Sequence, residues 1–390
     1  MEPWQGPIAL NGFGELWRKA LRNHFNCVSG MLQFNDRHAA GLIPAWRISL
    51  PVGELPMSKQ YLGHLSAHDP LHPYLVQDVL PRMGVRNGTA DFRVFSMKDG
   101  KVYLYEERHT CAQVVGKFFS SGGHHMTGAT ERMRQEFDNL ELLRGYGLAG
   151  YPHHVVRPLG TNACLNSILV EEYATGVPLG VFVNEAIHQG QWQPLFDKLT
   201  ALAYFLATLH NRTANGRGVD FDQDCAYLER LVRKLESKQT IGAGDAHEFA
   251  WLRDRWREKP RMWEDNQVLV HGDATPSNLL FGQGLSVIAI DLERMKRADR
   301  TFDLGRIAGE LQHYFLQATG RTHAAEPFIG HFLWEYACHF PDRDRAFRSI
   351  TGRLPFQMAL TLLRIARNAW VGAPQRRRLV EEAKVILRTA

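Results

Sequence analysis

The chain has 390 residues, of which 44% are hydrophobic and 11% aromatic, enough apolar material for two or three folded domains. The sequence has no apolar stretch near the roughly 20 residues of a bilayer span and no secretory leader pattern, so we expect a cytoplasmic protein without a membrane segment. The net charge of +5 comes from the last fifty residues, which hold eleven Lys/Arg against four Asp/Glu. No basic face or nucleic-acid-binding module stands out beyond this tail, so we expect no nucleic-acid partner.

Residues 1–88 are predicted to form an N-terminal extension of unknown role. They combine a short amphipathic helix over 14–25, Pro-rich irregular stretches, and a second helical piece over 74–83. None of these patterns belongs to a motif with known chemistry, so the extension predicts no function.

Residues 89–176 are predicted to form a small lobe built on antiparallel strands. Their apolar residues alternate with a period of two, which predicts strands at 91–97, 102–107, 112–119 and 163–173. The first two strands are joined by an Asp-Gly turn. A helix is predicted over 131–146, after the loop "SSGGHHMTGAT", which has the composition of a flexible linker.

Residues 177–390 are predicted to form a second lobe that is mostly helical. Apolar residues at helical spacing predict helices at 194–211, 224–235, 246–258, 303–318 and 327–338, and two more beyond residue 354. One polar hairpin interrupts them, because the apolar strands 267–270 and 286–290 flank "HGDATPSNLLFGQG". The sequence thus predicts an α+β fold with two lobes and a cleft between them.

This hairpin holds the residues with the clearest chemistry. Asp273 and Asn278 are five residues apart, and Pro276 prevents a regular helix between them. Asp291 follows the strand "SVIAI", where Asn278 can face it. Amide and carboxylate oxygens are ligands suited to Mg²⁺. Asp273 is then left to accept a proton from an incoming hydroxyl, while His271 is predicted to brace the loop through hydrogen bonds.

The segment "HGDATPSNLLF", followed by "VIAIDLERMKRADRTFDLGRI", resembles the catalytic segment of the aminoglycoside phosphotransferase and choline kinase family, relatives of the protein kinases that phosphorylate small molecules. The resemblance covers about residues 91–311 and implies a two-lobed protein-kinase-like fold. It implies that Asp273 is the catalytic base, that Asn278 and Asp291 hold Mg²⁺, and that Asp303 is structural. The "DLG" that starts at Asp303 is then not a metal-binding triplet.

The resemblance also implies partners upstream of the hairpin. A kinase-like small lobe needs a strand Lys that holds the nucleotide's α and β phosphates and a helix Glu that holds the Lys. Lys117 and Glu136 occupy these places. The segment "ILVEEYATGVPL" resembles the family's interlobe segment, which implies that the backbone of Glu172, Tyr173 and Ala174 meets the adenine edge.

One loop departs from the protein-kinase pattern. The turn "SMKDGK" has a single glycine, Gly100, where protein kinases carry a glycine-rich loop over the phosphates. Ser96 and the local backbone are predicted to bind the nucleotide instead. The choice between ATP and GTP stays open.

These observations predict a phosphotransferase that moves the γ-phosphoryl group of ATP or GTP to a hydroxyl of a small molecule with Mg²⁺. A catalytically silent nucleotide-binding module is one alternative, motivated by the unusual phosphate loop. A protein or peptide kinase is another, although the twelve residues from Asp291 to Asp303 hold no recognisable activation segment. The oligomeric state stays open. The Arg-rich C-terminus favours a neutral or anionic acceptor, but three acidic residues keep a cationic one open: Glu310, Glu326 and Glu335.

Overall fold

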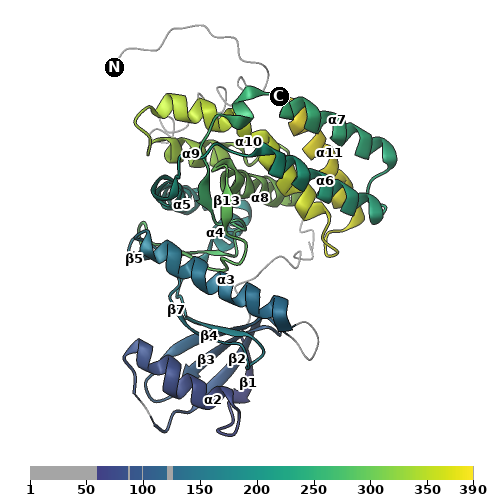
Figure 1. Ribbon diagram of the computed structural model, residues 1–390. Helices are drawn as coiled ribbons and strands as arrows, with labels where there is room; N and C mark the ends of the chain where they lie inside the picture. Colours follow the sequence, from purple (N-terminus) through teal and green to yellow (C-terminus); the bar gives the residue numbers. More distant parts are fainter. Residues whose placement is uncertain (1–58, 87, 99, 121–125, 390) are drawn as a thin grey trace, which may run out of the picture.

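The computed structural model describes residues 59–86, 88–98, 100–120 and 126–389. Figure 1 shows a small lobe with a β-sheet, a larger lobe made mostly of helices, and helix α3 (Met126–Gly145) lying between them. This arrangement confirms the predicted α+β, two-lobed fold.

The small lobe is a six-stranded antiparallel sheet in the order β1-β2-β3-β4-β8-β7. Its strands are β1 (Gln60–His64), β2 (Phe92–Lys98), β3 (Val102–Glu107), β4 (Gln113–Phe118), β7 (Pro158–Asn162) and β8 (Ile168–Glu172). The predicted strands over 91–97, 102–107 and 112–119 correspond to β2, β3 and β4. Their alternating side chains were a reliable signal because one face of each strand is covered.

The small lobe begins upstream of residue 89. Strand β1 pairs with β2, and Leu75 and Val79 pack into the same apolar core as Phe92. Residues 60–83, which the sequence analysis assigned to the extension, are therefore part of the sheet and its cover. Strand β1 gave no signal because it is an edge strand with mostly exposed side chains.

The predicted helix over 74–83 is a chain of short helical pieces. They are α2 (Leu71–Tyr74), the π-helical η1 (Leu75–Val79) and the 3₁₀ segment η2 (Leu80–Met83). The helix ends because Gly84 takes a left-handed conformation with φ +76°. The helix predicted over 14–25 lies outside the described residues.

The large lobe contains the predicted helices and one that the sequence analysis missed, α4. The elements are α4 (Leu179–Gln189), α5 (Trp192–Thr213), α6 (Phe221–Ser237), α7 (Ala243–Arg257), η3 (Pro260–Trp263), α8 (Thr301–Thr319), α9 (Glu326–Ala337), α10 (Arg343–Ala366) and α11 (Ala373–Arg388). Helix α4 was missed because it follows "ATGVPLG", whose composition favours a turn.

A second sheet connects the interlobe region to the polar hairpin. Its order is β5-β6-β12-β11-β9, and β10 and β13 form a separate pair. The strands are β5 (Ala149–Gly150), β6 (His153–Val155), β9 (Val177–Pro178), β10 (Val268–Val270), β11 (Leu279–Phe281), β12 (Val287–Ala289) and β13 (Lys296–Ala298). Strands β10 and β12 are equally short, but each lies in an apolar run that predicted it. Strands β5, β6 and β9 lack such a run and could not be predicted.

Helices α8 and α10 cross closely because two glycines of α8 lie in the contact. A Cβ on Gly305 would be 2.3 Å from the Cβ of Gln357, and one on Gly309 would be 2.6 Å from the Cβ of Thr361. Gly305 belongs to the "DLG" triplet, and a glycine is needed there because α10 packs too close for a side chain.

We expect Gly305→Ala to lower the free energy of unfolding by about 1–3 kcal/mol, because the new methyl group must displace α10. Gly244→Ala is the matched control, because Gly244 lies in α7 with open space where a Cβ would be. It is expected to stabilise the protein by about 0.5–1 kcal/mol. Urea denaturation measures both, and equal effects would contradict the packing argument.

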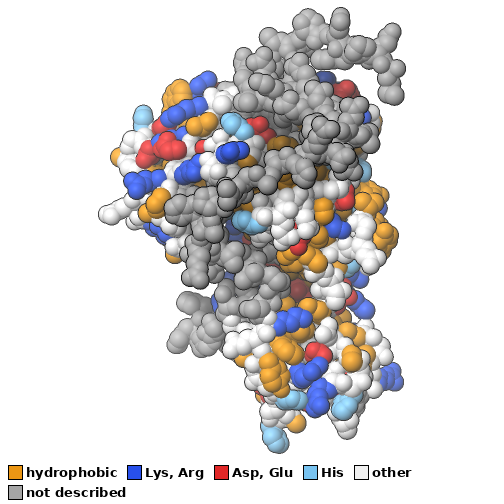
Figure 2. All heavy atoms as spheres, turned by 180° about the vertical axis from the view of Figure 1, so that it is seen from behind, with side chains coloured by type: hydrophobic (Ala, Val, Ile, Leu, Met, Phe, Trp, Pro, Cys, Tyr) orange, Lys and Arg blue, Asp and Glu red, His pale blue; other side chains and the backbone are white. Residues whose placement is uncertain are grey.

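In the part of the chain that the structure describes, no helix is long and apolar enough to cross a bilayer. Figure 2 shows basic and acidic side chains interspersed over the visible face of the large lobe.

Candidate active site

The polar loop between β10 and β11 is held in place by its backbone. The amides of His271 and Gly272 donate hydrogen bonds to the two carboxylate oxygens of Asp303, at 2.7 and 3.0 Å. Gly272 has φ +81°, and a Cβ there would lie 2.0 Å from the carbonyl oxygen of Arg294. Only glycine fits this turn, which sends the chain from the end of β10 toward Asp273.

Asp303 is fully buried at the start of α8. Burial disfavours its charge, but hydrogen bonds from His210 and from the backbone of His271 outweigh burial and hold the pKa of Asp303 below its usual value. His210 in turn hydrogen-bonds the hydroxyl of Tyr336 at 2.9 Å. Asp303 thus lies where the sequence analysis placed a supporting residue.

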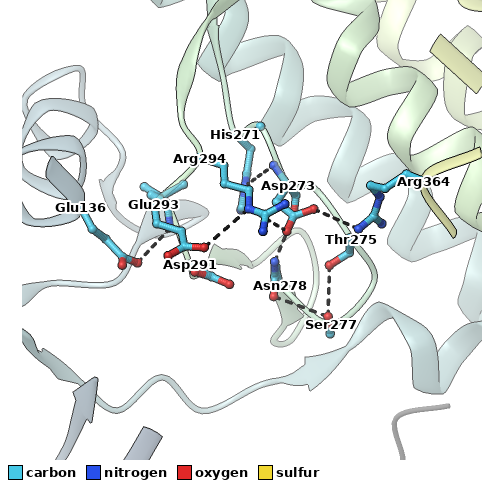
Figure 3. Close-up of polar contacts among 12 residues, drawn as sticks. Glu136, His271, Asp273, Thr275, Ser277, Asn278, Asp291, Glu293, Arg294 and Arg364 are labelled. Carbon is cyan, nitrogen blue, oxygen red and sulfur yellow. Dashed lines mark hydrogen bonds and ion pairs between the residues drawn. The ribbon is translucent and has the colours of Figure 1, made fainter. Parts of the chain in front are cut away.

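Asp273, Asn278 and Asp291 come together as the spacing predicted (Figure 3). The side-chain amide of Asn278 donates to the backbone oxygen of Asp273 at 3.0 Å. The amide of Ile290 donates to the backbone oxygen of Asn278 at 3.1 Å, so Asp291 directly follows the residue paired with Asn278. Asp291 has φ +64°, an unusual conformation for a non-glycine residue that is typical of functional sites.

The carboxylate of Asp273 lies between two arginines that the sequence analysis did not select. Arg364 Nη1 is 3.6 Å from Oδ1, and Arg294 Nε is 3.8 Å from Oδ2. Arg364 also forms an ion pair with Glu310. Arg364 belongs to α10, ninety-one residues beyond Asp273, and no local pattern in the sequence marks it.

Lys117 joins the two lobes through ion pairs. Its ammonium group donates to both carboxylate oxygens of Glu136 at 2.8 Å and to Asp291 Oδ1 at 2.6 Å. The side chain of Lys117 is 18% exposed and that of Glu136 is 0% exposed. Burial opposes the charge of Lys117, but these carboxylates outweigh burial and raise its pKa. Burial raises the pKa of Glu136 to about 7 despite the attraction of Lys117.

Three carboxylates form a cluster that could hold a metal ion. Oxygen atoms of Glu136, Asp291 and Glu293 lie within 4.8 Å of one another. Glu136 is buried and bound to Lys117, whereas Asp291 and Glu293 are partly exposed. Asp291, Glu293 and the amide oxygen of Asn278 are oxygen donors of the kind that Mg²⁺ prefers, so these residues fit that metal. Glu293 lies in the segment "VIAIDLERMKRADRTFDLGRI" that the sequence analysis compared with the phosphotransferase family, but it was assigned no role there.

Glu171 is a buried carboxyl that the sequence analysis missed. It pairs with Val115 in the sheet while Lys117 pairs with Leu169, so Glu171 and Lys117 share one face. Its Oε1 is buried and has no hydrogen-bond partner. Burial, aided by the charge of Glu136, raises the pKa of Glu171 to about 8. The sequence held one indication of this residue: Glu171 follows Leu169 by two positions in "ILVEEY", so a strand places it on the same face as an apolar residue.

Glu171→Gln is expected to gain stability relative to the parent as pH rises. The parent's carboxyl has a folded pKa of about 8 against an ordinary value of 4.5, so its protonated form favours the folded state at low pH. That contribution is lost as pH rises toward 8, whereas glutamine does not titrate. Between pH 5 and 9, the difference in unfolding free energy should change by about 2–4 kcal/mol. Glu141→Gln, at an exposed position of α3, is the control. If the difference in unfolding free energy between Glu171→Gln and the parent did not change with pH, the raised pKa of Glu171 would be contradicted.

The other predicted nucleotide contacts lie on β2 and at the end of β8. Ser96 lies in β2, paired with Gln60 and Tyr103. The side chain of Glu172 accepts a hydrogen bond from the backbone amide of Arg157 at 2.8 Å. The ammonium of Lys59 lies 4.3 Å from the ring centre of Tyr173, and Ala174 packs against the main apolar core. Contacts of these residues with a nucleotide stay predictions.

The chain is similar to solved structures of known proteins. The chain resembles solved structures of an ethanolamine kinase from Plasmodium vivax (13% identity, 78% of this chain and 79% of that chain, TM-score 0.49) and an amicoumacin kinase (15%, 76% and 88%, 0.49). A choline kinase from Streptococcus pneumoniae is 18% identical over 76% of this chain and 92% of its own, with a TM-score of 0.45. A search of curated protein sequences found no match.

The sequence model of one family matches residues 99–339, which is more than half of the chain and includes both Lys117 and the polar hairpin. The chain therefore belongs to the phosphotransferase enzyme family.

Proposed function

We propose that this protein transfers the γ-phosphoryl group of ATP or GTP to a hydroxyl group of a small molecule. The observation that carries the proposal is the convergence of Asp273, Asn278 and Asp291, with Lys117 contacting Asp291 from the other lobe. Family membership supports phosphoryl transfer, and the acceptor and donor are part of the proposal.

In the proposed reaction, the acceptor's hydroxyl oxygen forms a bond to the γ-phosphorus while the bond to the β–γ bridging oxygen breaks. Asp273 orients the hydroxyl and takes its proton, and a nucleoside diphosphate leaves. Lys117 neutralises charge on the nucleotide phosphates and is held by Glu136. Positioning and charge neutralisation supply most of the rate enhancement in such a site.

Asn278 and Asp291 would hold Mg²⁺, with Glu293 as a further donor. Bound there, Mg²⁺ supplies positive charge against the nucleotide phosphates. We expect removal of divalent cations with EDTA to abolish turnover and readdition of Mg²⁺ to restore it.

The segment between Asp291 and Asp303 favours a small acceptor over a protein. It contains β13, which pairs with β10 along its three residues, so these residues form structure within the lobe. Protein kinases use the corresponding region as an activation segment. A catalytically silent nucleotide-binding module is disfavoured because the proposed base, Asp273, is present and lies in the loop beside Asn278.

The test is ADP or GDP formation by the purified protein with Mg²⁺ across a library of hydroxyl compounds. Acceptor-dependent product that disappears in Asp273→Ala supports the proposal. Mg²⁺-dependent nucleotide binding without turnover on any acceptor would favour the silent module instead.

A further inference from the structure

Arg306, on α8, is a buried arginine that forms no direct ion pair with the described residues. Its side chain is 4% exposed, and its Nε and Nη1 atoms have no hydrogen-bond partner. Within the described part of the chain, no carboxylate forms an ion pair with it. A buried guanidinium in this state is costly, so its presence calls for an explanation.

Other buried arginines of the large lobe are paired. Arg353 is 1% exposed and lies 2.5 Å from Asp265 and 3.3 Å from Asp299. Arg300 also pairs with Asp265, at 2.9 Å. Arg353 also has buried Nε and Nη1 atoms without a hydrogen-bond partner, so the contrast lies in the ion pairs: carboxylates pair with Arg353 and Arg300, and none of the described carboxylates pairs with Arg306.

Arg306 lies one turn of α8 before Glu310, and the ion-pair partner of Glu310, Arg364, lies 3.6 Å from the proposed catalytic base, Asp273. Burial, together with the charge of Arg364, lowers the pKa of Arg306. Arg306, Glu310 and His313 are spaced by four and three residues and so occupy one face of α8.

Groups linked to Arg306 through Glu310 and Arg364 also have unsatisfied polar atoms. Besides the two atoms of Arg306, the buried atoms Arg364 Nε, His313 Nδ1 and Asp273 Oδ1 have no hydrogen-bond partner. Buried polar groups are normally satisfied by protein, water or ligand. Five such atoms from α8, α10 and the catalytic loop favour a polar ligand here.

Building on the proposed function, we propose that the acceptor carries a carboxylate, which Arg306 binds next to the hydroxyl presented to Asp273. Arg364 already pairs with Glu310 and lies 3.6 Å from Asp273, so Arg306 is the arginine whose donors are left for a ligand. The two arginines balance these two carboxylates, so the cluster accommodates the single charge of a carboxylate better than the two charges of a phosphate dianion. The planar fork of donors on a guanidinium also matches a carboxylate.

Binding of three matched six-carbon polyols tests the proposal by calorimetry. Gluconate, sorbitol and glucamine differ in an anionic, neutral or cationic end. Gluconate is expected to bind at least tenfold more tightly than the other two, because charge-assisted hydrogen bonds to Arg306 are made only with it. Arg306→Met is expected to reduce gluconate affinity to that of sorbitol. Equal affinities, tighter binding of glucamine, no detectable gluconate binding, or an unchanged Arg306→Met variant would each overturn the proposal.

Thermal unfolding separates a ligand-binding role from a structural one. Arg306→Met is expected to raise the Tm of the ligand-free protein by a few degrees, because it removes an unpaired buried charge. Arg353→Met, the matched control, is expected to lower the Tm by about 5–10 °C, because it leaves Asp265 and Asp299 without that partner. A comparable loss of Tm in Arg306→Met would show a structural role and overturn the proposal.

Product formation with the same three compounds distinguishes this inference from the proposed function. Faster ADP or GDP formation with gluconate than with glucamine supports both. Arg306-dependent gluconate binding without product would leave the carboxylate site standing and contradict phosphoryl transfer to this acceptor. Faster turnover of glucamine would overturn the carboxylate inference and support phosphoryl transfer.

Discussion

Replacing Asp273 with Asn is expected to lower acceptor-dependent product formation by about 10²–10⁴-fold, the usual contribution of a general base. Asparagine has nearly the same shape but cannot take the hydroxyl proton. The loop should keep its conformation, because Asn278 bonds to the backbone oxygen of residue 273 and Asp303 holds the preceding amides. Steady-state kinetics should show the loss in kcat, with nucleotide affinity nearly unchanged.

Asp342→Asn is the control for this experiment. Asp342 caps α10 by accepting a hydrogen bond from the amide of Arg345 at 2.9 Å, and it lies apart from the polar loop in the sequence. Its replacement should leave kcat within about twofold of the parent, as expected for a surface cap. If Asp273→Asn also kept its kcat within about twofold of the parent, Asp273 would be ruled out as the base.

Lys117→Met is expected to abolish nucleotide binding and to destabilise the protein by about 3 kcal/mol, because Glu136 loses its buried partner. The destabilisation should be larger at pH 9 than at pH 6. Burial holds the pKa of Glu136 at about 7 even beside Lys117, and losing that attraction raises it further. At pH 6 the carboxyl of the variant is therefore protonated, whereas toward pH 9 the folded state must bury either an uncompensated charge or a proton that the unfolded chain has released. Denaturant unfolding at both pH values, with and without nucleotide, measures each effect.

The double variant Lys117→Met/Glu136→Gln separates the two consequences. Removing both charges should restore most of the lost stability, since a neutral pair costs less to bury than one unpaired charge. Nucleotide binding should remain absent, because the ammonium that we propose contacts the phosphates is still missing. Equal stability of the single and double variants would show that the ion pair does not control folding.

The parts of this protein that could be predicted from sequence are those set by local spacing. Asp273, Asn278 and Asp291 lie within one hairpin, and the alternation in β2 and β3 is visible because each strand has six or seven residues. Arg364 reaches Asp273, and Glu310 on α8 reaches Arg364, only through the close crossing of α8 and α10. That crossing depends on tertiary packing, which the spacing of residues along the chain does not reveal.

The pairing of β9 with β11 has a consequence for how the enzyme can open. Two described connections between the lobes, residues 156–157 and 173–176, run side by side, because Glu172 and Arg157 exchange hydrogen bonds at 2.8 and 2.9 Å. From Val177 onward the chain belongs to the sheet of the catalytic hairpin. Rotation of the small lobe would therefore be concentrated in these few residues, and the segment beyond them would travel with the hairpin as one rigid unit.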